Sequence, residues 1–195
     1  LIYQTVKCEA NKMGFIKTTL QDAYLFEPKV FGDHRGFFME TYNEKMFEEA
    51  GLSFNFIQDN HAMSAEAGTL RGLHFQLEPY AQTKLVRVIK GAVYDVIVDL
   101  RKGSPTYGQW EGFILSEDNK RQLLIPKGFA HGYCTLVKDT EFVYKVDNYY
   151  SPECDCGITW NDSELNINWP TSTPILSEKD QKQPSFKELG DTFEF

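Results

Sequence analysis

KLVRVIKGAVYDVIVDL, residues 84–100, predicts two β-strands that meet at Gly91. Residues 84–90 alternate apolar and polar side chains, which is the pattern of a strand with one face against a core. Residues 92–100 are almost wholly apolar except for Asp95 and Asp99, and such a run predicts a strand buried on both faces. We therefore expect the two segments to form paired strands of a β-barrel or sandwich.

Short runs rich in β-branched and aromatic residues continue on both sides of this stretch, with turn residues roughly every 8 to 12 positions. This spacing predicts an all-β fold, a jelly-roll β-barrel or sandwich with a few short helices. The expected strands are residues 23–29, 36–42, 54–64, 68–76, 109–115, 121–125, 130–135 and 140–148. Residues 31–35 are expected to form a turn, residues 44–50 a short helix between Asn43 and Gly51, and the tail after Trp169 loops and short helix.

The chain has 195 residues, of which 42% are hydrophobic, enough for one domain with a substantial core. Regular patterning begins after Met13, so we expect residues 13–195 to form a single domain and residues 1–12 to be an N-terminal extension. The net charge of −8 gives no general attraction to nucleic acid. No apolar run is long enough for a membrane span, and no secretory signal is evident, so we expect a cytoplasmic protein without nucleic-acid or membrane partners.

Two segments place histidines on predicted strands: RGLHFQ (71–76) and IPKGFAH (125–131). Their spacing is similar to the two signature segments of cupins, jelly-roll proteins that hold a metal with three histidines and a glutamate. Here Gln76 takes the place of one histidine, the glutamate has no counterpart, and Thr135 replaces the usual asparagine. Because two imidazoles and an amide are a poor ligand set for a divalent metal, we expect neither a metal nor a cofactor.

Without a metal, His74 is suited to act as a general base, since imidazole titrates near neutral pH. Arg71 and Lys84 lie on strands expected to face the same cavity, and Arg35 follows a turn that would bring it nearby. Arginine matches phosphate oxygens, and lysine stabilises a developing oxyanion, so an anionic substrate is expected. The base also needs an orienting carboxylate, and the residues leave four candidates: Asp95, Asp99, Asp147 and Asp180. Tyrosines in residues 141–150 are candidate proton donors to carbon.

A longer set of motifs is similar to the dTDP-4-dehydrorhamnose 3,5-epimerase family over residues 13–184. The matching segments are FGDHRGFFMETYN (31–43), QDNHAMS (58–64), RGLHFQ (71–76), QTKLVRVIKGAVYDVIVDLRKGSPTYG (82–108), IPKGFAHGY (125–133) and YKVDNYYSPECDCGI (144–158), followed by WNDSELNINWP and LSEKD. The resemblance implies a cofactor-independent jelly-roll homodimer that inverts C3 and C5 of a dTDP-linked 4-keto-6-deoxyhexose. This activity belongs to dTDP-L-rhamnose biosynthesis.

The resemblance also assigns roles to residues. His74 would be the base, Asp180 its carboxylate partner, Lys84 the stabiliser of the enolate oxygen and Tyr144 the proton donor on the opposite face. The remaining residues implied in substrate binding are Arg35, Glu40, Gln58, Asn60, Arg71, His131, Asp155 (where relatives often have glutamate) and Lys179. Independently of the resemblance, the aromatic ring of Phe31 is a candidate for stacking on a base or sugar. Some nucleotide contacts would come from the partner subunit.

Three other functions are compatible with parts of this pattern. A mono-epimerase acting at C3 or C5, or a ketoisomerase, would use a related nucleotide-linked 4-keto-6-deoxy sugar. A cupin without activity would bind a sugar nucleotide and catalyse nothing. A metal-dependent cupin oxygenase would need the ligand that Gln76 replaces.

Overall fold

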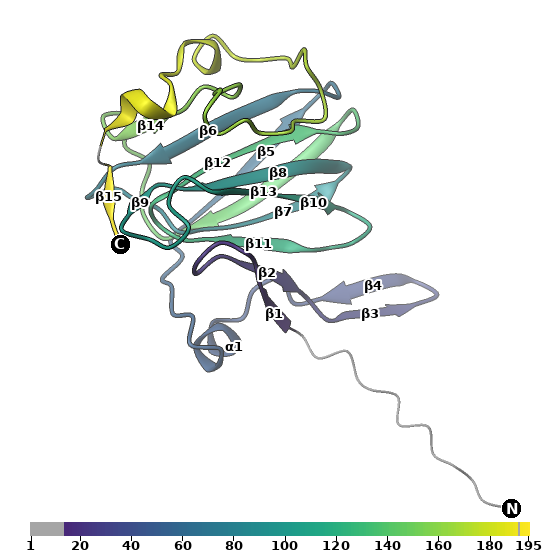
Figure 1. The fold of residues 1–195 in the computed structure, drawn as a ribbon. Helices are drawn as coiled ribbons and strands as arrows, with labels where there is room; N and C mark the ends of the chain where they lie inside the picture. The colour runs from purple at the N-terminus through teal and green to yellow at the C-terminus, as the bar shows by residue number, and fades with distance from the viewer. Residues whose placement is uncertain (1–13, 191) are drawn as a thin grey trace, which may run out of the picture.

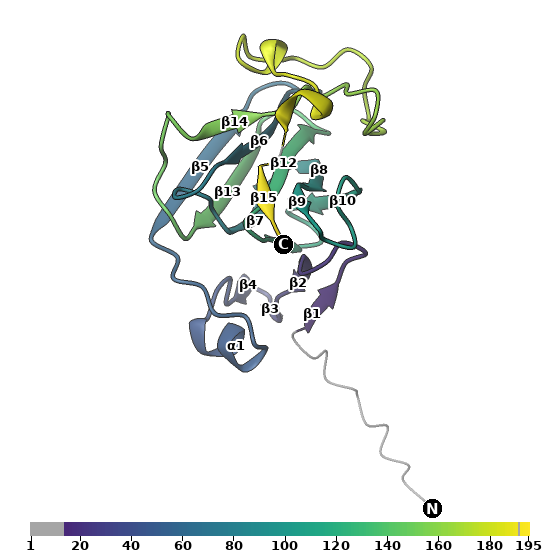
Figure 2. The same ribbon diagram turned by 60° about the vertical axis from the view of Figure 1, so that its left-hand side comes forward.

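The computed structural model describes residues 14–190 and 192–195, and the predicted extension at residues 1–12 lies outside them. Two antiparallel sheets pack face to face as a sandwich (Figures 1 and 2). The six-stranded sheet contains, in order, β1 (Gly14–Lys17), β2 (Tyr24–Glu27), β11 (Gln122–Ile125), β7 (Lys84–Lys90), β13 (Thr140–Val146) and β5 (Gln58–Ser64). The five-stranded sheet contains β10 (Trp110–Ser116), β8 (Ala92–Asp99), β12 (Phe129–Thr135), β6 (Leu70–Gln76) and β14 (Asp155–Gly157). The all-β jelly-roll prediction is confirmed.

Smaller elements lie around the sandwich. They are the hairpin of β3 (Val30–Asp33) and β4 (Gly36–Met39), the helix α1 (Glu44–Glu49), the 3-10 turns η1 (Asp180–Lys182) and η2 (Phe186–Leu189), and the parallel pair β9 (Arg101–Lys102) and β15 (Phe193–Glu194). Asn43 caps α1 as predicted, because its side chain accepts a hydrogen bond from the backbone N–H of Met46. In the described part of the chain, no helix is long and apolar enough to cross a membrane.

The stretch 84–100 is confirmed as two strands, but the prediction that they pair with each other is wrong. β7 pairs with β11 and β13, whereas β8 pairs with β10 and β12 in the facing sheet. Gly91 is therefore a corner at which the chain crosses between sheets. Its φ of +82°, and the 2.6 Å that would separate an added Cβ from Oγ1 of Thr140, explain why glycine stands there.

Other boundaries also needed correction. Residues 31–35 are not one turn, because residues 31–33 belong to β3 and only His34 and Arg35 make the turn. Residues 54–57 are not in a strand; Phe54 and Phe56 instead pack in the cluster around α1. The sequence patterns also left β1, β9, β14 and β15 unassigned, and the last three are strands of only two or three residues.

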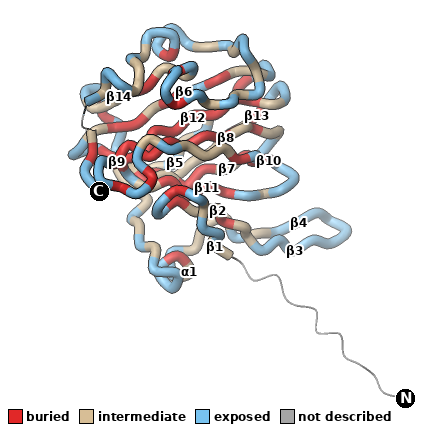
Figure 3. Tube along the Cα trace, viewed as in Figure 1, coloured by how far each residue is buried: buried red, intermediate tan, exposed pale blue. Residues whose placement is uncertain are grey.

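Three apolar clusters organise the molecule, and Figure 3 shows the buried positions concentrated along the central strands. The first lies between the two sheets, the second between the five-stranded sheet and the C-terminal segment, and the third between the six-stranded sheet and α1. β8 contributes to two of them, with Val93 and Ile97 in the first and Val96 and Val98 in the second. The prediction that this strand is buried on both faces is confirmed.

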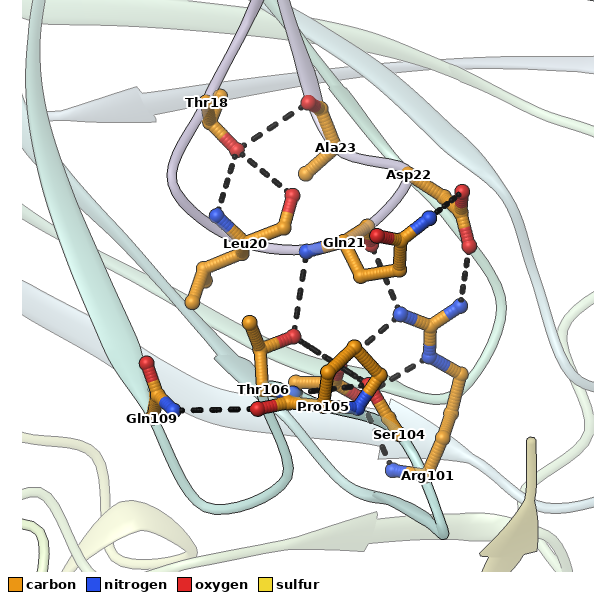
Figure 4. A network of polar contacts seen from close by, with 11 residues as sticks. Thr18, Leu20, Gln21, Asp22, Ala23, Arg101, Ser104, Pro105, Thr106 and Gln109 are labelled. Atoms are coloured by element: carbon orange, nitrogen blue, oxygen red, sulfur yellow. Dashed lines mark hydrogen bonds and ion pairs between the residues drawn. The ribbon is translucent and has the colours of Figure 1, made fainter.

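A buried ion-pair network ties the β1–β2 turn to the segment after β8 (Figure 4). Arg101 donates through Nε and Nη2 to the carboxylate of Asp99 at 2.9 Å, and through Nη1 to Asp22 at 3.0 Å. Ser104 and Thr106 donate to the same buried Asp99 carboxylate. These hydrogen bonds hold the pKa of Asp99 below its usual value although burial opposes them, so the carboxylate stays ionised and paired.

Candidate functional site

A cavity of about 390 Å³ lies between the two sheets and is bounded on one side by residues 175–180. This volume is in the range of small-molecule sites. Six of the predicted site residues line it: Arg71, His74, Lys84, His131, Tyr144 and Asp180. They come from both sheets and from the C-terminal segment, so the fold brings together residues that span more than half of the chain.

A β-bulge in β6 places Arg71 and His74 on the same wall. Regular alternation sends residues three apart to opposite faces of a strand. Here His74 pairs with His131 while Arg71 pairs with Tyr133, so β6 has one residue more than β12 between the two pairs. Gly72 occupies the irregular position with φ +129°, and an added Cβ would lie 2.5 Å from a backbone Cα of β12. Gly72 thus permits the bulge that turns both Arg71 and His74 toward the same cavity.

His74 forms a close pair with a carboxylate from far along the chain. Its Nε2 lies 2.5 Å from Oδ1 of Asp180, and the hydroxyl of Ser177 donates to Oδ2 at 2.7 Å. Burial acts to raise the pKa of Asp180, but the hydrogen bonds from His74 and Ser177 outweigh it and hold the pKa below its usual value. An ionised carboxylate in this position fixes the imidazole ring and stabilises its protonated form. Of the four carboxylates considered from the sequence, Asp180 is the one that contacts His74 in the described residues.

Lys84 reaches the cavity from the opposite sheet. It lies on the same face of β7 as Val86 and Val88, which belong to the core between the sheets. Burial lowers the pKa of Lys84 from 10.5 to about 8, while Asp155 and Asp95 act to raise it. Near neutral pH the side chain remains a desolvated cation, and a negative charge that develops beside it will be strongly stabilised.

Two tyrosines share the cavity wall. Tyr144 lies on β13, and burial raises its pKa, with Arg71 opposing the effect. Tyr133 lies on β12 and stacks on Phe142 with ring centroids 4.1 Å apart; burial raises its pKa to about 12. Both phenols therefore hold their protons near neutral pH, as a proton donor must. Ser64 opposes the rise in the pKa of Tyr133, and Nε of Arg71 donates to the Ser64 hydroxyl at 3.2 Å.

His131 has its own buried carboxylate. Its Nε2 lies 3.0 Å from both oxygens of Asp95, whose side chain is fully buried. His131 and His74 are direct cross-strand partners, so the cavity contains two neighbouring histidine–carboxylate pairs. Asp95 was considered from the sequence as a partner of His74, and the structure pairs it with His131 instead.

The other predicted residues divide into two groups. Gln58 and Asn60 lie on the face of β5 that also carries Ala62 of the cavity wall, and the Gln58 amide donates to Asn60 at 2.9 Å. Lys179 forms an ion pair with Asp155, which also accepts a hydrogen bond from a tyrosine hydroxyl at 2.8 Å. Asp155 and Lys179 are close enough to Lys84 to act on its pKa. The first group, Gln58, Asn60, Asp155 and Lys179, therefore lies around the cavity.

Phe31, Arg35 and Glu40 lie outside the cavity of the same chain. The first two belong to the β3–β4 hairpin and Glu40 directly follows it, and Figure 1 shows the hairpin extending beyond the sandwich. Arg35 is 78% exposed and pairs with Asp33 of its own turn at 2.5 Å. The expectation that the turn would bring Arg35 near His74 is wrong within one chain, because the hairpin pairs with itself and carries the turn away from the sheets.

The donor set fits a proton-transfer site better than a metal site. Both cavity histidines direct a ring nitrogen at a carboxylate, and Gln76 is committed to backbone groups of residues 80, 149 and 151. Within residues 14–190 and 192–195, no three His, Cys, Asp or Glu side chains cluster as metal ligands would. The cavity instead offers two histidine–carboxylate pairs, the half-buried cation Lys84 and two protonated phenols.

Comparisons with known proteins agree with this geometry. The family model for dTDP-4-dehydrorhamnose 3,5-epimerase matches residues 17–188. The chain belongs to the dTDP-4-dehydrorhamnose 3,5-epimerase family. An epimerase of this name from Shigella flexneri is 59% identical over 169 residues, covering 86% of this chain and 93% of the relative.

Solved structures of the epimerase family have the same fold. The Bacillus anthracis enzyme, crystallised with TDP and PPi, is 61% identical with a TM-score of 0.87, covering 88% of this chain and 98% of that one. The Legionella pneumophila enzyme, in complex with dTDP-4-keto-L-rhamnose, is 44% identical with a TM-score of 0.89, covering 93% and 98%. This chain is therefore an isomerase of the epimerase family.

Two contributors to the epimerase-family site were not singled out from the sequence. Ser177 precedes Asp180 by three residues in LSEKD, a spacing at which a hydroxyl often bonds a nearby carboxylate or backbone group. Tyr133 follows His131 by two residues, so strand alternation alone places both on one face. Ser177 could have been found by examining the turn before Asp180, and Tyr133 by examining the strand position two residues after His131.

Proposed function

We propose that this enzyme converts dTDP-4-dehydro-6-deoxy-D-glucose to dTDP-4-dehydro-L-rhamnose by inverting C3 and C5, in dTDP-L-rhamnose biosynthesis and without a cofactor. The observation that carries the proposal is the His74–Asp180 pair at 2.5 Å in a cavity that also presents the half-buried cation Lys84. High identity to epimerases of this name over most of the chain supports the substrate class.

The proposed mechanism uses one base and one oxyanion stabiliser for two carbons. C3 and C5 both neighbour the C4 carbonyl, so removal of either proton gives an enolate whose charge lies on the same oxygen. His74 takes the proton, and Asp180 stabilises the imidazolium that forms. Lys84 stabilises the enolate oxygen. Tyr144 returns a proton from the opposite face, and its raised pKa keeps it protonated for that step.

We propose that the nucleotide diphosphate is bound at the rim of this cavity. Arg71 supplies a guanidinium for phosphate oxygens. The other proposed contacts surround the cavity: Gln58, Asn60, His131, Asp155 and Lys179. Among these, the Lys179–Asp155 ion pair would have to adjust when an anionic group binds, because the lysine then has two competing partners.

A homodimer would bring the remaining predicted residues to the site. Phe31 and the neighbouring Phe37 and Phe38 are 52%, 58% and 66% exposed on the hairpin, which is unusual for side chains of this size. We propose that this hairpin docks on a second copy, so that Arg35, Glu40 and Phe31 contact the nucleotide of the other subunit. Residues 13–195 are proposed to act as one domain in the cytoplasm.

Solvent exchange tests the reaction directly. Incubation with dTDP-4-dehydro-6-deoxyglucose in deuterium oxide should place deuterium at both C3 and C5, as read by NMR. His74→Ala should abolish exchange at both carbons. His61→Ala is a matched control, because His61 also pairs with a carboxylate, Glu141 at 3.0 Å, but does not line the cavity. Unimpaired exchange in His74→Ala would refute the assignment of the base.

The same experiment separates the alternatives. Deuterium confined to one carbon would indicate a mono-epimerase, and migration of the carbonyl would indicate a ketoisomerase. Binding that raises the melting temperature without any exchange would indicate a protein that only binds the sugar nucleotide. Tyr144→Phe should lower net inversion more than exchange, because it removes the second proton transfer and leaves the first; equal losses would contradict its role as the acid.

A further inference from the structure

Asp95 is a charged group for which the proposed mechanism has no use. It lies on β8 with a fully buried side chain, in a strand whose inward neighbours are Val93 and Ile97 of the core. Burial raises its pKa, so the carboxylate is held at a cost in solvation. A carboxylate of this kind persists where particular partners compensate for its burial, and Asp95 has two of them.

The first partner is His131. Asp95 is opposite Tyr133 in the register of β8 and β12, so His131 is its diagonal neighbour on the same face. Both carboxylate oxygens lie 3.0 Å from Nε2 of His131. A carboxylate accepts hydrogen bonds, so this geometry favours the tautomer with the proton on Nε2, and Nδ1 is then free to accept a hydrogen bond in the cavity.

The second partner is Lys84, which approaches from the opposite sheet. Asp95 and Lys84 each favour the charged form of the other: Asp95 acts to raise the pKa of Lys84, and Lys84 acts to lower that of Asp95. Asp155 has the same effect on Lys84 from β14, and Lys179 opposes it. Asp95 is the deeper of the two carboxylates and the one that also holds a histidine.

These contacts also affect the base. His131 is the direct cross-strand neighbour of His74, and such pairs have Cβ atoms about 5 Å apart. Asp95 therefore orients the ring that lies beside the base, and it favours the charged form of Lys84.

We propose that Asp95 is a positioning residue for the reaction: it fixes His131 beside the base with its Nδ1 toward the substrate, and it supplies a buried negative charge that supports Lys84. This inference rests on the proposed function for its kinetic consequences. The position of the proton on His131 is independent of it. On β10 the residue opposite Asp95 is apolar, Phe113, so that strand supplies no competing charge at this point.

The pH dependence of turnover distinguishes this role from a structural one. The alkaline limb reports the loss of charged Lys84. Loss of a nearby negative charge lowers the pKa of Lys84, so in Asp95→Asn the alkaline limb should move to lower pH by roughly 0.5 to 1 unit. A purely structural loss would lower the amplitude and leave the alkaline limb in place. Asp118→Asn removes a carboxylate from an exposed turn and should not move this limb.

A second measurement needs neither the Asp95→Asn variant nor enzymatic activity. Nitrogen-15 NMR of the histidine rings, with His131 assigned from the spectrum of His131→Gln, reports which ring nitrogen carries the proton. The expected result is a proton on Nε2 of His131 in the wild-type protein. A proton on Nδ1 alone would overturn the proposal, as would an unmoved alkaline limb in a folded Asp95→Asn. If the wild-type protein does not turn over the keto sugar, the proposed function fails, and the tautomer still decides the role of Asp95.

Discussion

Lys84→Met should make the protein more stable while it removes turnover. Burial lowers the pKa of Lys84 from 10.5 to about 8. At about 1.4 kcal/mol per pKa unit, this difference corresponds to a cost to folding of about 3 kcal/mol. Methionine fills a similar volume without a charge, so the variant should recover most of this cost, about 2 kcal/mol once partial solvation of the ammonium by the cavity is allowed for.

The sign of the pH dependence follows from the lowered pKa. Below about pH 8 the lysine is protonated in both the folded and the unfolded chain, and the full cost is present. As the pH rises from 8 toward 10.5 the folded protein loses its proton first, so the cost disappears. The stability advantage of Lys84→Met should therefore shrink by about 1 kcal/mol between pH 7 and pH 9.5, because the unfolded lysine is still mostly protonated at pH 9.5.

Urea unfolding of the wild-type protein and of Lys84→Met at pH 7 and pH 9.5 measures the difference in their free energies of unfolding. In thermal unfolding at pH 7, the melting temperature of Lys84→Met should be higher by roughly 4 to 8 °C, given about 2 to 4 °C per kcal/mol for a domain of this size. Lys138→Met, an exposed control, should stay within about 0.5 kcal/mol at both pH values. Because packing differences are the same at each pH, a stability difference that does not change between pH 7 and pH 9.5 would refute the reasoning.

Three substitutions test the scaffold by chemical denaturation. Gly72→Ala should cost more than about 2 kcal/mol, because φ is +129° and the new Cβ would lie 2.5 Å from backbone; a neutral effect would contradict the bulge. Arg101→Met should cost about 3 to 5 kcal/mol by leaving Asp99 buried and unpaired, and a smaller cost would mean that water replaces the guanidinium. Asn43→Ala should cost about 1 kcal/mol through the lost helix cap, whereas Asn43→Asp should retain it.

Local patterns were sufficient to predict most strands, since alternation and β-branched runs reflect the burial of one or two faces. Residues 92–100 illustrate this, because an apolar run interrupted only by two aspartates could belong only to a strand between two cores. The pairing of residues 84–90 with 92–100 failed for a physical reason. A glycine between two strands is equally compatible with a hairpin and with a corner between sheets, and only the tertiary contacts of β7 and β8 decide.

The cavity could be predicted in part. The strand patterns and the two histidine segments were enough to bring His74 and Lys84 together, but regular alternation would have sent Arg71 to the opposite face, and the bulge at Gly72 corrects this. The choice of Asp180 came from the family resemblance, because a contact between residues 106 positions apart leaves no trace in local pattern. The pairing of Asp95 with His131 was equally invisible, since it depends on the diagonal register of β8 and β12.

The C-terminal segment has a consequence for the order of events during synthesis. Asp180 and Ser177 belong to a segment that crosses over the five-stranded sheet only after every strand of both main sheets has been made (Figures 1 and 2). A nascent chain can thus complete its sandwich and still hold His74 without its carboxylate. Competence for proton transfer is therefore acquired in a last docking step, the same step that completes the apolar cluster over the five-stranded sheet with Phe193.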